Sequence, residues 1–95
     1  MAAISGQRTV TTAGTAVRLS AATAKCTGPL MVKALDTNTG IVALGNDGAG
    51  AVTVSNGLRL AAGDVIVFEF VGDLYDIWLD SAVNGEGVSW LKLNV

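Results

Sequence analysis

The stretch "SNGLRLAAGDVIVFEF", residues 55–70, joins two turn signals to two apolar runs. Asn56-Gly57 is the strongest short signal for a β-hairpin, and Gly63-Asp64 predicts a second reversal. Between them "LRL" is long enough only for a very short strand or a crossing segment. The following "VIVFEF" puts two phenylalanines on one face of a strand and Glu69 on the other, away from the core. The stretch therefore predicts short strands joined by tight turns.

The rest of the chain repeats this pattern of short apolar runs separated by Gly, Asn and Asp. Turn signals recur every eight to twelve residues or so, which is typical of all-β domains. We read 36–40, 46–50, 71–73 and 84–87 as hairpin loops, and 21–28 as a loop. The predicted strands cover residues 8–12, 15–21, 30–35, 41–45, 51–55, 65–71, 74–80 and 88–93. About eight short strands predict a single small antiparallel β-sandwich or barrel.

The length of 95 residues fits one domain with one small core. The opening "MAAISG" consists mostly of small residues and has a weak hydrophobic pattern. We therefore expect residues 1–7 to be an N-terminal arm that orders against a neighbouring molecule, and residues 8–95 to be the single β domain.

The composition is 51% hydrophobic and only 15% charged, with a mean hydropathy of +0.52. Ordinary domains carry about 25% charged residues, so the surface is expected to be poor in charge and suited to association. The alternative is a monomer whose many small residues raise the hydropathy. The net charge of −2 and the scattered basic residues argue against nucleic-acid binding. No apolar run is long enough for a membrane span and no signal peptide is evident, so we expect synthesis in the cytoplasm.

The sequence lacks the residues of a typical active site. It contains no histidine, the commonest general base and transition-metal ligand. Cys26 is the single cysteine, which excludes an intramolecular disulfide and is best read as a buried thiol. No glycine motif precedes a phosphate-binding helix, and no acidic loop has the ligand spacing of a calcium site. We therefore predict no enzyme activity, catalytic residue, metal or cofactor.

The aromatic and acidic residues near the C-terminus are the candidates for binding. Strand alternation would place Asp76, Trp78 and Asp80 on one outer face. Trp78 and Trp90 suit a sugar-stacking platform, or equally a core or subunit interface in which tryptophan is enriched. We take Trp78, Trp90, Asp76, Asp80 and Arg8 as the candidate interaction surface.

Four segments together resemble small all-β virion proteins of tailed bacteriophages. They are "GQRTVTTAGTAVRLS", "VKALDTNTGIVALGN", "GLRLAAGDVIVFEF" and "DLYDIWLDSAVNGEGVSWL", in this order, and they cover most of the chain. This resemblance implies a capsid decoration or cement protein that stabilises the head by bridging capsomers. Its implied partners are the major capsid protein and two further copies in a homotrimer, and its implied location is the capsid surface of the virion after synthesis in the bacterial host. The alternative is a receptor-binding or glycan-binding module of a tail fibre, head fibre or baseplate.

Overall fold

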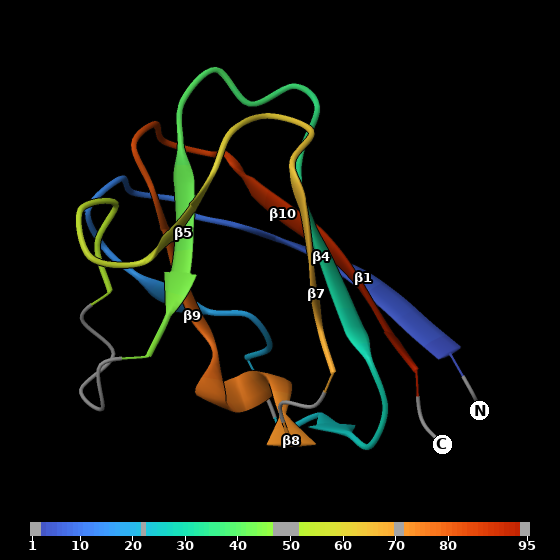
Figure 1. Cartoon of the computed structure of the whole chain (residues 1–95). Helices are drawn as coiled ribbons and strands as arrows, with labels where there is room; N and C mark the ends of the chain where they lie inside the picture. The colour runs from blue at the N-terminus through green and yellow to red at the C-terminus, as the bar shows by residue number, and fades with distance from the viewer. Residues whose placement is uncertain (1–2, 22, 47–51, 70–71, 94–95) are drawn as a thin grey trace.

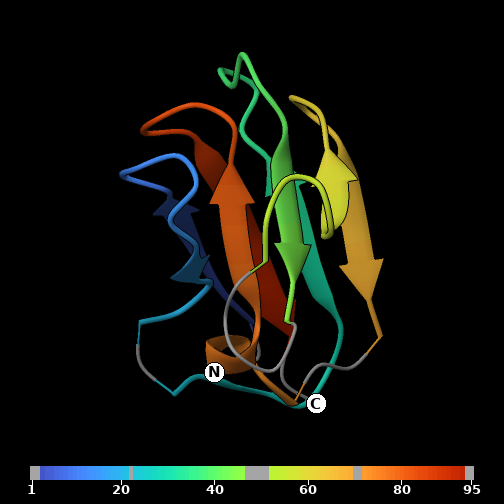
Figure 2. The same ribbon diagram turned by 90° about the vertical axis from the view of Figure 1, so that its left-hand side faces the viewer.

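The computed structural model describes residues 3–21, 23–46, 52–69 and 72–93. Two four-stranded antiparallel sheets face each other as the layers of a sandwich (Figures 1 and 2), with strand orders β1-β10-β4-β7 (sheet A) and β2-β9-β5-β6 (sheet B). A two-stranded pair, β3 and β8, lies at one end. The strands of the described residues are β1 (Ala3–Thr9), β2 (Val17–Arg18), β3 (Lys25–Cys26), β4 (Leu30–Ala34), β5 (Val42–Gly45), β6 (Leu58–Leu60), β7 (Val65–Phe68), β8 (Gly72–Asp73), β9 (Trp78–Ser81) and β10 (Gly87–Leu93).

The strands pair as a nested series. β1 pairs with β10, β2 with β9, β3 with β8, β4 with β7 and β5 with β6, and every pair is antiparallel. Further pairings of β10 with β4 and of β5 with β9 complete the two sheets. One long hairpin folded over into two sheets has the connectivity of a jelly roll. The predicted all-β antiparallel domain is confirmed; of the two predicted alternatives it is the sandwich and not the barrel, and the described residues form ten short strands where about eight were predicted.

Three of the predicted turns join different sheets. Residues 36–40 lead from β4 to β5, 61–64 from β6 to β7, and 84–87 from β9 to β10, and each passes from one sheet to the other. The prediction of 36–40 and 84–87 as hairpin loops is wrong. Turn residues specify where the chain reverses, whereas burial between the layers determines which strands pair. Among the described strands, only β5 and β6 are both consecutive and paired. The loop read at 46–50 lies largely outside the described residues.

Several predicted strands are shorter than expected. Within 15–21 only Val17–Arg18 is paired, and 52–55 contains no strand because Thr53 O accepts backbone hydrogen bonds from Asn56 and Gly57. The strand predicted at 74–80 is interrupted by a 3-10 turn, Leu74–Asp76, where Asp73 caps the turn by accepting from Tyr75 N. These local side-chain and backbone bonds compete with the sheet ladder.

The prediction of an N-terminal arm at residues 1–7 is wrong for residues 3–7. They belong to β1, which runs along β10 from Ala3 opposite Leu93 to Thr9 opposite Gly87. The hydrophobic pattern is weak here because Gly6 lies against the indole ring of Trp90 and Ser5 is exposed on the outer side. Backbone pairing, which composition does not report, places this segment in the sheet.

The core lies between the two sheets. Buried aliphatic side chains from both layers and from the 3-10 turn form it, among them Leu30, Val32, Leu44, Leu74, Leu79 and Val88. Phe68 packs against this cluster, and Glu69 is exposed, as the alternation of the "VIVFEF" run predicts. Phe70 lies outside the described residues.

Candidate functional site

The outer face of sheet A carries most of the exposed large hydrophobic side chains among the described residues. Seven large hydrophobic side chains are exposed among all the described residues, and five of them lie on this face. Leu91 is opposite Met31 on β4, and Met31 is opposite Val67 on β7, so three apolar side chains form a continuous row across the sheet. We call the five residues the apolar face; they are Met31, Val65, Val67, Leu91 and Leu93.

The outer face of sheet B, in contrast, is covered by the chain itself. Ala43 is fully buried beneath the loop of residues 52–57, where an added Cβ on Gly57 would lie 2.9 Å from the Ala43 methyl carbon. On the neighbouring strand, Oδ1 of Asp80 accepts a hydrogen bond of 2.9 Å from Gly14 N, in the loop between β1 and β2. Two loops therefore cover the middle of the outer face of sheet B, over Ala43 and Asp80, whereas the outer face of sheet A has exposed apolar side chains.

The apolar face has almost no charge. Lys33 is the one charged side chain among the described residues of sheet A that point outward, and its Nζ lies 3.4 Å from Asp36 Oδ1. The outward neighbours on β1 and β10 are Ser5, Gln7 and Ser89. Charge depletion at the centre of an exposed apolar patch is typical of protein interfaces.

Sequence reasoning missed the apolar face, although one signal was present. "VIVF" in β7 is apolar at four consecutive positions, so both faces of that strand are apolar. "LMVKA" in β4 likewise has Met31 at an outward position between buried Leu30 and Val32. Strands that are apolar on both faces are expected to be buried on both faces. In this domain the described residues cover only the inner face of β4 and β7.

The predicted acidic candidates lie in different environments. Asp80 and Trp78 share the outer side of sheet B, as alternation predicts, but Asp80 is only 2% exposed. Its expected exposure is wrong, because the loop that donates from Gly14 covers it. Asp76 is exposed at the end of the 3-10 turn, and its carbonyl oxygen accepts from Asn46 Nδ2.

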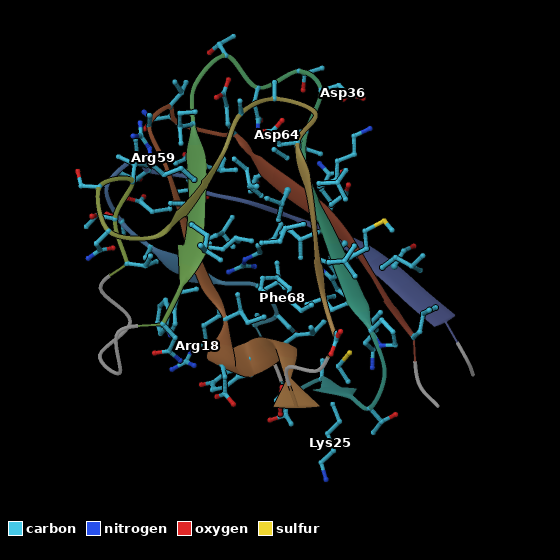
Figure 3. The ribbon with its side chains drawn as sticks, viewed as in Figure 1. Arg18, Lys25, Asp36, Arg59, Asp64 and Phe68 are labelled. Atoms are coloured by element: carbon cyan, nitrogen blue, oxygen red, sulfur yellow. The ribbon has the colours of Figure 1, made fainter. Side chains whose placement is uncertain are left out.

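Trp78 is part of an aromatic and cationic cluster. The guanidinium carbon of Arg18 lies 3.7 Å from the centre of the Tyr75 ring and 4.3 Å from the centre of the Trp78 ring. Arg18 also donates through Nη1 to the carbonyl oxygen of Tyr75 at 2.7 Å. The label of Arg18 in Figure 3 marks this cluster beside the 3-10 turn. These contacts hold the cation by cation–π attraction and leave Trp78 half-buried.

Trp90 and Arg8 point inward from sheet A. Trp90 packs against the core, with its indole ring beside Gly6. Arg8 is opposite buried Val88 in the ladder, and its Nε is buried without a hydrogen-bond partner among the described residues. The five predicted residues therefore do not form one surface. They are divided among the interior of sheet A, the outer side of sheet B and the 3-10 turn.

Two half-buried carboxylates join loops. Oε2 of Glu86 accepts from Thr39 N at 2.6 Å and from the Thr39 hydroxyl, while Oε1 accepts from Gly40 N. The backbone hydrogen bond from Thr39 is the main cause that lowers the pKa of Glu86 below its ordinary value. Hydrogen bonds to Oδ1 of Asp73, first from Ala24 N and then from Tyr75 N, likewise lower the pKa of Asp73. Both carboxylates therefore stabilise loops in their ionised form.

The groups that most often take part in catalysis or metal binding are few in the part of the chain that the structure describes. The sequence has no histidine, and no group of three or more Cys, Asp or Glu residues within the described ranges could hold a metal ion. Cys26 is fully buried, and its thiol donates to the carbonyl oxygen of Gly28 at 3.2 Å.

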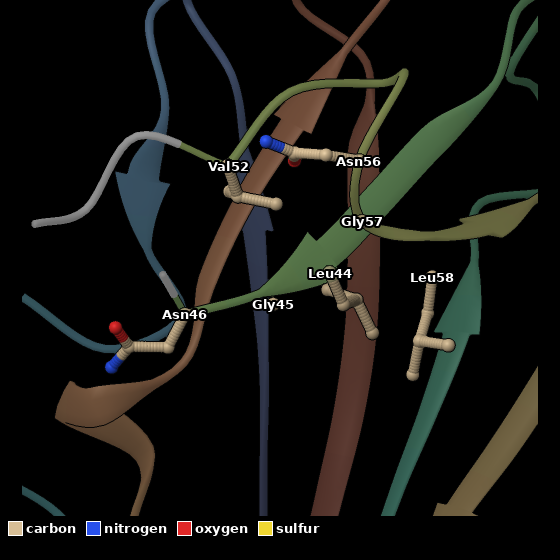
Figure 4. A pocket seen from close by; sticks show the side chains of 7 residues that line it. All are labelled: Leu44, Gly45, Asn46, Val52, Asn56, Gly57 and Leu58. Carbon is tan, nitrogen blue, oxygen red and sulfur yellow. The ribbon is translucent and has the colours of Figure 1, made fainter. Parts of the chain in front are cut away.

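A pocket of about 420 Å³ opens at the end of β5, beside the turn of residues 53–57 (Figure 4). None of its seven lining residues is ionisable; they are Leu44, Gly45, Asn46, Val52, Asn56, Gly57 and Leu58. The side chain of Asn56 accepts from Thr53 N, and that of Asn46 donates to the backbone of Asp76. The pocket therefore offers apolar contact and two amides that already have local partners.

Comparison with protein-family models, curated proteins and solved structures finds no match to this chain. Among the residues that the structure describes, no helix has the length and apolar character needed to cross a membrane.

Proposed function

We propose that this chain is a non-enzymatic virion protein of a tailed bacteriophage, most similar in role to capsid decoration or cement proteins. The observation that carries the proposal is the apolar face. It is an almost uncharged row of side chains on the outer side of sheet A, whereas two loops of the chain cover the middle of the outer side of sheet B. The resemblance of the four sequence segments to small all-β virion proteins supplies the biological setting. Jelly-roll connectivity is common among viral proteins, and this agreement is an analogy of fold.

In this role the apolar face binds the outer surface of the head, with the major capsid protein as partner. Binding to the assembled shell, and not to the unfolded chains, stabilises both partners by mass action. The protein is made in the bacterial host cytoplasm and resides on the capsid surface of the virion. No cofactor, nucleic acid or membrane takes part.

The test is addition of the purified protein to mature, undecorated capsids, followed by sedimentation and thermal melting of the particles. Wild-type protein should sediment with the capsids and raise their melting temperature. Met31→Asp should abolish binding because it buries an unpaired charge in the centre of the apolar row. Val83→Asp is a matched control, since Val83 is 37% exposed and Met31 45%, but Val83 lies outside sheet A. Absence of binding by folded wild-type protein at saturating concentration would refute the proposal.

A second candidate function is favoured by the cluster of Arg18, Tyr75 and Trp78. Aromatic rings beside a cation at the surface suit a glycan or receptor ligand, as in a fibre or baseplate module. Glycan-array binding that is lost in Trp78→Ala and retained in Met31→Asp would favour this function over cementing.

A further inference from the structure

Among the described strands, β1 is a long one at the edge of its sheet, and none of these strands pairs with its outer side. It is the outermost strand of sheet A, beside β10 (Figure 1). Val10 N donates to Glu86 O and Gly85 N donates to Val10 O, so the even-numbered residues of this segment direct their backbone groups toward β10. In an antiparallel ladder, successive residues direct their backbone N–H and C=O groups to opposite sides of the strand. The odd-numbered residues therefore direct these groups toward the free edge; they are Ala3, Ser5, Gln7 and Thr9.

The other sheet edges are shorter or carry a charge. β2 has two residues, β6 has three including exposed Arg59, and β7 has four and is followed by Glu69. β1 has seven residues that pair with β10 one to one, without a bulge or a proline. Its one charged residue, Arg8, shares the inner face with Val88. Short edges, charges, prolines and bulges are the usual means of preventing edge-to-edge pairing, and the free edge of β1 has none of them.

We propose that two copies of this chain associate through β1, antiparallel and about a two-fold axis at Gly6. The partner must be an extended strand, because only a strand offers donors and acceptors with the alternating spacing of an edge. With the axis at Gly6, Ser5 pairs with Gln7 of the second copy and Ala3 with Thr9, so all seven residues overlap. This arrangement joins the two four-stranded sheets A into one continuous sheet and satisfies the free backbone groups of both copies.

Of the two edge strands of sheet A in a second copy, β1 is a better partner for this edge than β7 is. The two-fold pairing uses the same strand twice, whereas pairing of β1 with β7 of a second copy would leave three of the seven residues unmatched and place Glu69 at the junction. The side chains of Ser5 and Gln7 are exposed and neutral, so the two copies meet without opposed like charges. The interface is narrow, and its dimer is therefore expected to depend on concentration. This dimer differs from the homotrimer that the resemblance implies.

The first measurement is the molar mass of the full chain by sedimentation equilibrium from about 1 μM to about 1 mM, a range in which weak interfaces become populated. We expect a shift from 9.6 kDa to twice that mass. Amide hydrogen exchange over the same concentration range identifies the strand edge that forms the interface. The N–H groups of Ser5 and Gln7 should become protected as the dimer forms, while those of Gly6 and Arg8 are protected at every concentration. A monomer at every concentration, or a trimer, would overturn the proposal.

Two sets of variants test the register. Gln7→Pro removes an edge-facing N–H in each copy without removing a bond to β10, and should raise the dimer dissociation constant about tenfold or more, whereas Gln7→Thr keeps the N–H and should dimerise like the wild type. The double variant Ser5→Lys/Gln7→Lys places two positive charges opposite each other across the two-fold axis and should prevent dimerisation. The double variant Ser5→Lys/Gln7→Glu places a positive charge opposite a negative charge and should allow dimerisation again.

The charge variants decide the outcome if Gln7→Pro does not fold. Equal dimerisation of the two charge variants would overturn the two-fold register. Because capsid binding is measured separately with Met31→Asp, failure of the dimer and failure of the proposed function are distinguishable.

Discussion

The side chain of Asn38 bonds both backbone groups of Gly87. Nδ2 donates to the carbonyl oxygen of Gly87 at 2.9 Å, and Oδ1 accepts from Gly87 N at 3.3 Å. Asn38 is 7% exposed and lies 49 residues before its partner. This pair ties the turn after β4 to the first residue of β10, and so connects the loops that pass between the two sheets.

Asn38→Ala should lower the free energy of unfolding by about 1 to 3 kcal/mol, since it leaves the buried N–H of Gly87 without its acceptor. The Gly87 carbonyl oxygen keeps the hydrogen bond that Leu35 N donates to it. Urea denaturation followed by tryptophan fluorescence measures the loss. Asn38→Asp is the matched control: it keeps the acceptor for Gly87 N but places a carboxylate oxygen against the Gly87 carbonyl, so it should also be destabilising. A stability equal to wild type in both variants would show that water replaces the side chain.

Gly87→Ala should be more destabilising than Gly85→Ala. An added Cβ on Gly87 would lie 2.0 Å from the carbonyl oxygen of Arg8, so β1 would have to move, at a cost of about 3 kcal/mol. Gly85 has a φ of +80° and open space around it, so alanine there costs about 1 to 2 kcal/mol of backbone strain. Thermal unfolding of both variants checks the order, and the reverse order would contradict the close approach of β1.

Stability should fall on the acid side as Glu86 becomes protonated. The backbone hydrogen bond from Thr39 lowers the pKa of Glu86 in the folded state, so the unfolded chain takes up the proton at a higher pH than the folded chain does. The stabilisation is present above the ordinary carboxyl pKa of about 4 and is lost as the pH falls through the folded value. Denaturation midpoints from pH 7 to 2 should decline less steeply in Glu86→Gln than in wild type. Thr39→Val, which removes one of the three hydrogen bonds, should give an intermediate slope.

Arg18→Lys should weaken the cluster with Tyr75 and Trp78. A lysine ammonium cannot stack as a plane between two rings while donating to the Tyr75 carbonyl, so we expect a loss of about 1 kcal/mol in stability. In a Trp90→Phe background the fluorescence of Trp78 alone should change in intensity and shift toward the emission of a more exposed indole. An unchanged spectrum would show that the guanidinium does not define the surroundings of Trp78.

The sequence by itself determined the class of fold and which residue types are missing from the chain. Alternation in "VIVFEF" predicted the inward side of Phe68 and the exposure of Glu69, because side-chain direction follows from strand geometry alone. The lack of histidine and the single cysteine follow from composition and need no structure.

Only the tertiary structure decided which strands pair and which surfaces stay open. The turns at 61–64 and 84–87 could be read from the sequence, but not that they cross between sheets, because a turn fixes the reversal and not the partner. Asp80 alternates outward as predicted and is nevertheless buried, since a loop some 66 residues away in sequence bonds to it. The apolar face and the free edge of β1 likewise result from long-range pairing. This pairing brings Leu91, Met31 and Val67 into one row, and it leaves β1 as the outermost of the described strands in its sheet.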